Sequence, residues 1–348
     1  RSSLQTHGGD FRGQPGAGML LTRGSEKRGG KKDRQMENTD ANQDLEQLER
    51  LMSPCVLCPR ECRAERRGGA KGFCGLGTEI VVSDAMPHYG EEPPLSGRHG
   101  AGTIFFSSCN LRCIFCQNHQ ISRKTTGSIL TPEELAEVML RLQERGCHNI
   151  DAVTPTHQTP PIMVALDIAR RRGLTIPYIH NCGGYESLEV IRLLAGRVEI
   201  YMPDMKYGDD DLAQEFSGVK EYRRHARAAL TEMARQVGDG LELREGVAVR
   251  GLLIRHLVLP GCLENSFTVL DDIRASVSTG VSLSIMSQYT PAAQACRHPL
   301  LGRRIRRDEY RRVVDYALAL GFSQLFVQEV DDRHLSPDFD RDDPFNWE

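Results

Sequence analysis

The sequence lacks both an excess of charge and long hydrophobic runs. Its 348 residues carry a formal net charge of −3 at pH 7, with 44 Lys and Arg against 47 Asp and Glu. This near-neutral balance gives no reason to expect a polyanionic partner such as nucleic acid. The longest apolar stretch, residues 251–261, is interrupted by Arg255 and His256. We therefore expect no segment that spans a membrane.

A secretory signal is also missing from the first forty residues, which are rich in Gly, Arg and Lys and hold no continuous apolar segment. The chain nevertheless has eleven cysteines. Without a signal we do not expect a secreted disulfide scaffold, and clustered thiols in a reducing compartment indicate metal binding instead. We therefore expect a cytoplasmic protein. The Arg-rich, acid-poor start is also typical of organelle transit peptides, so import stays open.

The chain divides into four predicted segments. Residues 1–44 offer few large apolar side chains and are expected to be a disordered basic tail. Residues 45–100 are rich in Cys, Gly, Pro and Arg and short of regular periodicity, so they need a metal or a neighbour to hold a fold. Residues 101–330 carry the main domain. Residues 331–348 are an acidic tail, for which packing across that domain and exposure to solvent are both open.

From residue 103 onward, short apolar runs alternate with amphipathic stretches. Thr131 and Glu134 form a capping box at the start of the first helix. The regular alternation implies six or seven β–α units with parallel strands and right-handed crossovers. Strands are predicted at 103–108, 149–155, 176–181, 198–203, 252–259, 281–286 and 325–330, and helices at 132–146, 161–172, 187–195, 222–237, 267–277 and 307–320.

Two architectures fit this order, a doubly wound sheet and a barrel. The number of units is short of eight, and no Gly-x-Gly-x-x-Gly fingerprint follows the first strand. Both observations favour an α/β fold of the partial (β/α)6 barrel type. In either architecture, ligands bind at the carboxyl ends of the strands, so residues at those positions are the candidate site residues.

Three cysteines lie in the loop after the first strand: Cys109, Cys113 and Cys116, spaced C-x3-C-x2-C. Thiolates this close in sequence can hold three corners of a cubane iron–sulfur cluster. A zinc site with four protein ligands would need one more ligand nearby, and His119 is the only local candidate. A cubane with three protein ligands leaves one iron open to an exogenous chelator.

This loop, with the aromatic Phe115 before its last cysteine, resembles the signature of the radical S-adenosylmethionine (SAM) superfamily. The resemblance implies a [4Fe–4S] cluster whose fourth iron binds SAM through its amino and carboxylate groups. It further implies reductive cleavage of SAM to methionine and a 5′-deoxyadenosyl radical that abstracts hydrogen. A partial (β/α)6 barrel is implied as well, in agreement with the strand count.

The resemblance covers roughly residues 50 to 330. Within the superfamily, the chain is similar to the pyruvate formate-lyase activating-enzyme-like iron–sulfur proteins. A sister group, the radical SAM proteins found with Memo-like proteins, has a comparable Cys-rich N-terminal segment and stays open as an alternative. The segments that carry the resemblance are 55–62 with Cys74, 90–97, 103–113, 154–157, 201–207 and 254–261.

Thr154, Thr156 and His157 end the second predicted strand. Activating enzymes carry a Gly-Gly-Glu segment at this place, which contacts the SAM amino group. This chain departs from that segment, so the three residues are assigned as SAM contacts by position alone. A hydrogen-bonded histidine at the barrel rim is an equally good interpretation of His157.

Asp204 and Lys206 end the fourth predicted strand and, being two residues apart, point to the same face. A carboxylate and an ammonium there can bind the charged ends, or the ribose hydroxyls, of a zwitterionic ligand such as SAM. The resembling family has Asp-Leu-Lys at this place. An ion pair with a purely structural role at the rim is the alternative.

Arg255 lies within the apolar strand 252–259. A buried guanidinium is costly without an anionic partner, and we expect that partner to be the SAM carboxylate. The resembling activating enzymes also have Arg at this position.

A second cysteine set precedes the predicted barrel, with the spacing C-x2-C-x3-C-x11-C. Four thiols are enough for a closed site, and structural zinc and an auxiliary [4Fe–4S] cluster both fit. The four remaining cysteines of the chain are expected to be buried thiols. The second set is Cys55, Cys58, Cys62 and Cys74, and the remaining four are Cys147, Cys182, Cys262 and Cys296.

Together these features predict a radical SAM oxidoreductase of the activating-enzyme type, in which the cofactor performs the chemistry and the barrel positions it. Activation of a glycyl-radical enzyme is one candidate reaction. The alternative is a Cys-rich zinc or iron–sulfur protein that transfers electrons or assists assembly without SAM chemistry. That alternative leaves Asp204, Lys206 and Arg255 unexplained. The expected partners are SAM, an electron donor such as flavodoxin or ferredoxin and, as one candidate substrate, a protein.

Overall fold

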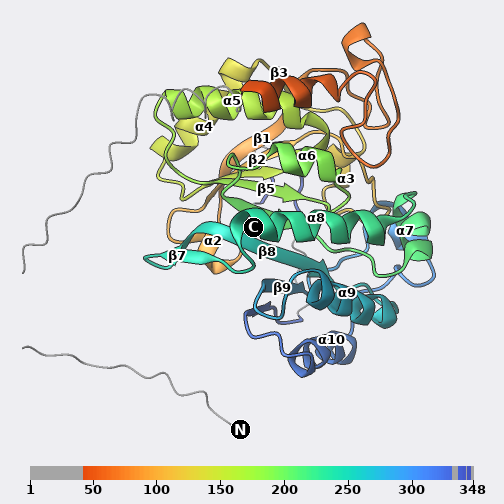
Figure 1. Cartoon of the computed structure of the whole chain (residues 1–348). Helices are drawn as coiled ribbons and strands as arrows, with labels where there is room; N and C mark the ends of the chain where they lie inside the picture. Colours follow the sequence, from red (N-terminus) through yellow and green to blue (C-terminus); the bar gives the residue numbers. More distant parts are fainter. Residues whose placement is uncertain (1–41, 331–335, 342, 346–348) are drawn as a thin grey trace, which may run out of the picture. The chain divides into compact units, whose positions relative to one another are not determined.

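The computed structural model describes residues 42–330, 336–341 and 343–345 (Figure 1). Ala41–Glu348 form one compact unit. All but the last three residues of the predicted tail, 1–44, lie outside the described residues. Within the described ranges, every helix is too short or too polar to cross a membrane.

A sheet of parallel strands forms the centre of the fold. Seven strands pair with one another in chain order, each parallel to the next. The strand order runs from β10 at one edge to β3 at the other without closing into a ring. The predicted partial barrel is therefore confirmed. The parallel strands are β2 (Ala101–Phe106), β4 (Ile150–Val153), β5 (Tyr178–Cys182), β6 (Ile200–Pro203), β8 (Val247–Leu257), β9 (Ser282–Met286) and β10 (Leu325–Val327).

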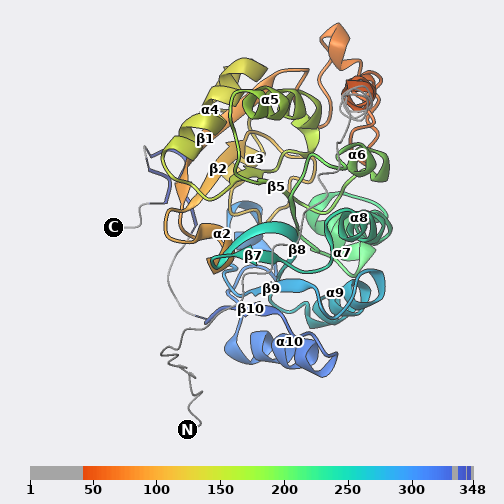
Figure 2. The same ribbon diagram turned by 60° about the vertical axis from the view of Figure 1, so that its left-hand side comes forward.

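Six helices follow these strands along the outer side of the sheet (Figures 1 and 2). The pairs α4–α5, α6–α8, α8–α9 and α9–α10 are in contact. The predicted capping box starts α4: the Thr131 hydroxyl accepts from the Glu134 amide, and Glu134 accepts from the Thr131 amide. The helices are α4 (Pro132–Glu144), α5 (Thr159–Arg171), α6 (Leu188–Leu193), α8 (Tyr222–Val237), α9 (Leu263–Ser276) and α10 (Arg307–Ala319).

Residues 45–100 are more regular than the sequence predicts. They contain the nine-residue strand β1 (Ile80–His88), which pairs antiparallel with both β2 and β3. The first three residues of β1 are all buried, so the strand lacks the alternation that would have revealed it. This segment also contains η1 (Arg66–Gly68), α2 (Pro93–Ser96) and most of a helix at 42–50.

The remaining short elements lie within the main domain. They are α3 (His119–Ser122), β3 (Ser128–Leu130), η2 (Thr156–Gln158), α7 (Asp210–Ser217), β7 (Glu242–Arg244) and η3 (Ala293–Arg297).

The two faces of the sheet bury different cores because alternate strand residues point in opposite directions. Tyr178 and Tyr201 belong to the large core between sheet and helices. Ile179 and Ile200 belong to a small core on the inner face, which Leu95 of α2 joins. Since the Leu95 carbonyl accepts from Asn149, just before β4, α2 packs near the amino ends of the strands. Open space inside the barrel therefore lies toward the carboxyl ends.

The described part of the C-terminal tail packs on the barrel. The rings of Phe339 and Phe345 lie 5.2 and 5.4 Å from the ring of Phe105 on β2. Phe345 also contacts His88, at 4.2 Å between ring centroids. For residues 336–341 and 343–345, packing rather than exposure is therefore observed.

The capping box predicts a measurable stability difference. Replacing Thr131 with Ala leaves the amide of Glu134 without its acceptor, and we expect a loss of about 1 kcal/mol in the free energy of unfolding. Chemical denaturation measures this loss. Thr125→Ala is the matched control, because Thr125 is exposed and precedes no helix. Equal stability of the two variants would contradict the assigned role of the cap.

Candidate functional site

A cavity of about 200 Å³ opens at the carboxyl ends of the strands. Its wall is built by the loop after β2, by the ends of β4, β5, β6, β8 and β9, and by the end of β1. The predicted site residues on this wall are Cys109, Cys113, Phe115, Cys116, Thr154, Asp204, Lys206 and Arg255.

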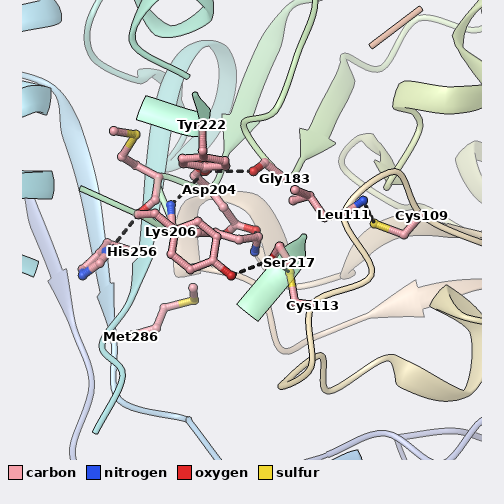
Figure 3. A network of polar contacts seen from close by, with 12 residues as sticks. Cys109, Leu111, Cys113, Gly183, Asp204, Lys206, Ser217, Tyr222, His256 and Met286 are labelled. Atoms are coloured by element: carbon pink, nitrogen blue, oxygen red, sulfur yellow. Dashed lines mark hydrogen bonds and ion pairs between the residues drawn. The ribbon is translucent and has the colours of Figure 1, made fainter. Parts of the chain in front are cut away.

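The three-cysteine loop is held by strained backbone and by hydrogen bonds. Ser108 and Arg112 adopt left-handed backbone conformations, with φ of 70° and 56°. Such strain persists only where surrounding contacts impose it, and it is common at functional sites. The Ser217 hydroxyl donates to Cys113 Sγ at 3.0 Å, and the Leu111 amide donates to Cys109 Sγ at 3.3 Å (Figure 3). The chain therefore supplies hydrogen bonds that a thiolate accepts.

The thiols of this loop are costly to ionise without a metal. Burial and the neighbouring Cys113 raise the pKa of Cys109 to about 12. The same two causes raise the pKa of Cys116. A bound cationic metal removes both the desolvation penalty and the mutual repulsion of the thiolates, so metal binding displaces these protons. The donor set therefore fits a thiolate-held metal group.

The spacing of the three sulfur atoms is wider than a zinc site requires. Among the described residues, the only group of three or more His, Cys, Asp or Glu whose ligand atoms all lie within 4.8 Å of one another is the buried set His180, Cys182 and Glu186. Sulfur ligands of a tetrahedral zinc ion, bound at about 2.3 Å, lie about 3.8 Å apart. The cysteines of the loop are therefore too far apart to bind one zinc ion, and a larger group such as a cubane fits them better.

Asp204 and Lys206 form an ion pair at the end of β6 (Figure 3). Burial alone would lower the pKa of Lys206, but the Asp204 carboxylate and Cys113 raise it. The Tyr222 hydroxyl accepts from the Lys206 amide at 2.9 Å and donates toward the carbonyl of Gly183 at 3.0 Å. The pair is thus fixed at the cavity wall beside the loop that carries Cys109, Cys113 and Cys116, which we call the cluster loop.

Two glycines after β5 allow close approach of three chain segments. A Cβ on Gly183 would lie 2.5 Å from the Cδ1 of Leu111, in the cluster loop. Gly184 has a φ of 77°, and a Cβ there would lie 2.1 Å from the carbonyl oxygen of Asp204. Glycine is therefore required at position 184, whereas a side chain at position 183 would require the Leu111 side chain to shift.

Arg255 finds its anionic partners within the chain. Its Nε donates to Glu92 at 3.0 Å, and its Nη2 is in close contact with both Glu91 and Glu92. Burial would lower the pKa of Arg255, but Glu92 and Glu91 raise it well above its usual value. The expected need for an anion is therefore met within the chain, by two carboxylates of the 90–97 segment. Arg255 also lines the cavity, so its contact with the SAM carboxylate stays a prediction.

Thr156 and His157 do not reach the cavity wall. Thr156 donates to Glu186 at 2.6 Å, and the Nε2 of His157 lies 2.8 Å from the carbonyl oxygen of Ser107. Both are buried in η2. Of the three residues predicted after β4, only Thr154 lines the cavity, and contact of the other two with SAM stays a prediction.

The cavity wall also includes polar residues that sequence reasoning missed. His88 and Glu91 line it from the end of β1 and the following loop, with His88 Nε2 and Glu91 Oε1 3.8 Å apart. Asn181 of β5 lines it and donates to the buried Asp151 at 3.4 Å. His88 and Glu91 were missed because the sequence did not predict strand β1, which leads to them. A search for the anion that Arg255 requires could have found Glu91.

The second cysteine set is also brought together. A Cβ on Gly72 would lie 3.2 Å from Cys62 Sγ and 3.5 Å from Cys74 Sγ. Burial raises the pKa of Cys58 to about 12, with Cys55 and Cys74 acting in the same direction. Of the four cysteines outside both sets, Cys147, Cys182 and Cys262 are buried as expected, whereas Cys296 is exposed.

Comparison with known proteins indicates the family. Residues 103–261 match the family model described as the Radical SAM superfamily, and this range contains the cluster loop and the ends of β4, β5, β6 and β8. Residues 103–261 are thus similar to the radical SAM superfamily. Radical SAM proteins use a [4Fe–4S] cluster and SAM, in agreement with the donor set at the cavity.

Two proteins of Methanocaldococcus jannaschii are similar to this chain. The uncharacterized protein MJ0674 is 26% identical over 285 residues, which cover 78% of this chain and 77% of that protein. The uncharacterized protein MJ0808 is 28% identical over 163 residues, which cover 40% of this chain and 46% of that protein. The match thus spans less than half of MJ0808.

Solved structures of low similarity include two radical SAM proteins. SuiB of Streptococcus suis, bound to the precursor peptide SuiA, has a TM-score of 0.44 at 14% identity. The match covers 64% of this chain and 47% of SuiB. Methylornithine synthase (PylB) has a TM-score of 0.43 at 17% identity, with 63% of this chain and 61% of that chain covered.

Two buried histidines predict a loss of stability in acid. Burial lowers the pKa of both His157 and His256 from 6.5 to about 4. Below pH 6.5 the unfolded chain takes up protons that the folded chain refuses until about pH 4. The free energy of unfolding should therefore be fully retained above pH 6.5 and should fall between pH 6.5 and 4.

Denaturation at several pH values measures this slope. His256→Gln should show a shallower slope than the wild type between pH 6.5 and 4. The exposed His99→Gln serves as the control and should keep the slope of the wild type. An unchanged slope in His256→Gln would show that His256 is not held neutral by the fold.

Proposed function

We propose that this protein is a radical SAM enzyme that reductively cleaves SAM at a [4Fe–4S] cluster and uses the 5′-deoxyadenosyl radical to abstract hydrogen from a substrate. The proposal rests on one observation: Cys109, Cys113 and Cys116 line the same cavity as Asp204 and Lys206. Similarity to the superfamily supports the same chemistry.

Cys109, Cys113 and Cys116 would hold the cluster, leaving one iron for SAM. When bound, the cluster and SAM supply the electron and the radical, so the protein needs no general base for this step. The hydrogen bond from Ser217 to Cys113 would orient that ligand and adjust the cluster's potential. The electron itself would come from a donor of the flavodoxin or ferredoxin class.

Asp204, Lys206 and Phe115 would bind SAM. The ion pair places a carboxylate and an ammonium at the cavity wall, the two charges that complement the amino and carboxylate groups of SAM. Phe115 is buried at the wall, with Tyr207, Phe216 and Tyr289 around its ring. Thr154, with a strained φ of 62°, faces the same space.

The wall beyond the cluster loop would exclude water from the radical. Phe105, Phe106, Leu257 and Met286 line it together with Phe345 of the C-terminal tail. Apolar side chains at these positions would keep bulk water away from the site of hydrogen transfer. A glycine of a partner enzyme remains one candidate substrate within this proposal, as the activating-enzyme resemblance suggests.

The first prediction of this proposal concerns the cluster loop. Wild-type protein reconstituted anaerobically with iron and sulfide, then given dithionite and SAM, should form 5′-deoxyadenosine. Cys113→Ala should lower this product by at least about 100-fold, because loss of a cluster ligand removes the metal group. Chromatography of the quenched reaction measures the product.

Cys147→Ala is the matched control, since Cys147 is a buried thiol distant from both cysteine sets in the core beside β2. It should retain the activity of the wild type. If the wild type forms no 5′-deoxyadenosine while its cluster is intact, the protein is an electron carrier or assembly factor instead, and the proposed function is wrong.

The second prediction concerns SAM binding. Asp204→Asn removes one charge of the ion pair and should weaken SAM binding about tenfold, the effect of losing roughly one charge-assisted hydrogen bond. Equilibrium dialysis against the reconstituted protein measures the dissociation constant. Asp211→Asn, on the exposed face of α7, should leave it unchanged. Equal affinity in all three proteins would remove Asp204 from the SAM site.

A further inference from the structure

The N-terminal cysteine set contains a buried cation that requires an anion. Arg66 is 2% exposed, and its Nη1 lies 3.8 Å from Cys55 Sγ. Its Nη2 is buried and has no hydrogen-bond partner. The guanidinium is always charged, and a buried charge without a counter-ion is strongly destabilising. Neutral thiols do not provide that counter-ion, whereas metal-bound thiolates do.

The spacing of this set favours an iron–sulfur cluster over zinc. No three sulfur atoms of Cys55, Cys58, Cys62 and Cys74, all of them described residues, lie within 4.8 Å of one another. Tetrahedral zinc would require all four at about 3.8 Å. The cluster loop shows the same wide spacing. The missing side chain at Gly72 also leaves room between Cys62 and Cys74 for a bulky group.

Arg60 connects the two cysteine sets. Its guanidinium donates to the carbonyls of Asn110 and Leu111, within the cluster loop, and to that of Ser217 at 2.9 Å. Arg60 is two residues from both Cys58 and Cys62, and Asn110 directly follows Cys109. One guanidinium therefore lies near a cysteine of each set.

A second hydrogen bond joins the two cysteine sets. The Ser108 hydroxyl, next to Cys109, donates to the carbonyl of Cys74. The N-terminal set is thus attached to the cluster loop at both Arg60 and Ser108. The contacts place the two cysteine sets next to each other, with the Arg60 guanidinium bound to the cluster loop.

We propose that Cys55, Cys58, Cys62 and Cys74 hold a second [4Fe–4S] cluster, and that Arg60 couples its reduction potential to that of the cluster in the Cys109–Cys116 loop. The coupling rests on the proposed function for the existence of the loop cluster, whereas the second cluster does not. A positive charge near a cluster favours its reduced form, so one guanidinium near two clusters raises both potentials.

Metal analysis tests the second cluster by itself. A Cys109→Ala, Cys113→Ala, Cys116→Ala variant, purified anaerobically and reconstituted with iron and sulfide in the presence of zinc, should retain about four iron atoms per chain. Adding Cys55→Ala and Cys58→Ala should remove them. One zinc atom and no iron in the triple variant would overturn the proposal. A failure of the proposed function would instead show as missing 5′-deoxyadenosine in a wild type that holds iron in both sets.

Potentiometry followed by electron paramagnetic resonance (EPR) tests the coupling. Arg60→Gln should shift the midpoint potentials of both clusters to more negative values, and Arg60→Lys should keep both near the wild type. Arg67→Gln is the matched control, because Arg67 is exposed and pairs with Glu49, so solvent screens its charge. A shift of only one cluster, or of neither, would overturn the coupling.

A measurement on the wild type covers the case in which Arg60→Gln does not load its clusters. In the fully reduced protein, two adjacent paramagnetic clusters should broaden each other's EPR signals. This broadening should vanish in the triple cysteine variant. Two iron–sulfur signals that add without broadening would contradict the placement of the clusters side by side.

Discussion

Seven strands run parallel in chain order, and their carboxyl ends meet at one edge of the sheet. Every predicted site residue on the cavity wall depends on this alignment, because Cys109, Thr154, Asp204 and Arg255 follow or end different strands. They are up to 146 residues apart in sequence, from 109 to 255, yet face one space. At the opposite edge, Leu95 of α2 fills the interior. The open space in the barrel thus lies at the carboxyl edge, where these residues meet.

The segment before the barrel contributes more than a metal site. Its β1 extends the sheet, its α2 closes the barrel interior, and its Glu91 and Glu92 neutralise Arg255. Arg60 fixes the cluster loop through backbone carbonyls. A chain lacking this segment would expose the inner core and leave a buried guanidinium without its counter-ions, so we regard residues 45–100 as part of the catalytic unit.

Much of the fold could be predicted from the sequence because buried parallel strands produce short apolar runs. Capping residues such as Thr131 with Glu134 also indicate where a helix begins. The strand β1 could not be predicted, since its buried residues Ile80, Val81 and Val82 do not alternate. Site residues at strand ends were predictable because ligands of such folds bind at the carboxyl ends of the parallel strands. Side-chain direction after a strand was not, because it depends on local turns such as η2, in which Thr156 is buried outside the cavity wall.

The partner of Arg255 shows a second limit of sequence reasoning. Burial within an apolar strand correctly indicated that this guanidinium needs an anion. Its partner Glu92 lies 163 residues earlier in the chain, and only the tertiary fold brings the two together. These internal partners could not be inferred from the sequence. Arg255 still lines the cavity, so its contact with SAM stays a prediction beside those of Asp204 and Lys206.

The central claim is that the Cys109–Cys116 loop holds a cluster with one iron open to SAM. The most direct test is the EPR spectrum of the anaerobically reconstituted, dithionite-reduced protein before and after addition of SAM. Direct binding of SAM to an open iron changes that iron's ligands, so the account predicts a clear change in the g-values of one cluster. A spectrum that stays the same at saturating SAM would contradict it.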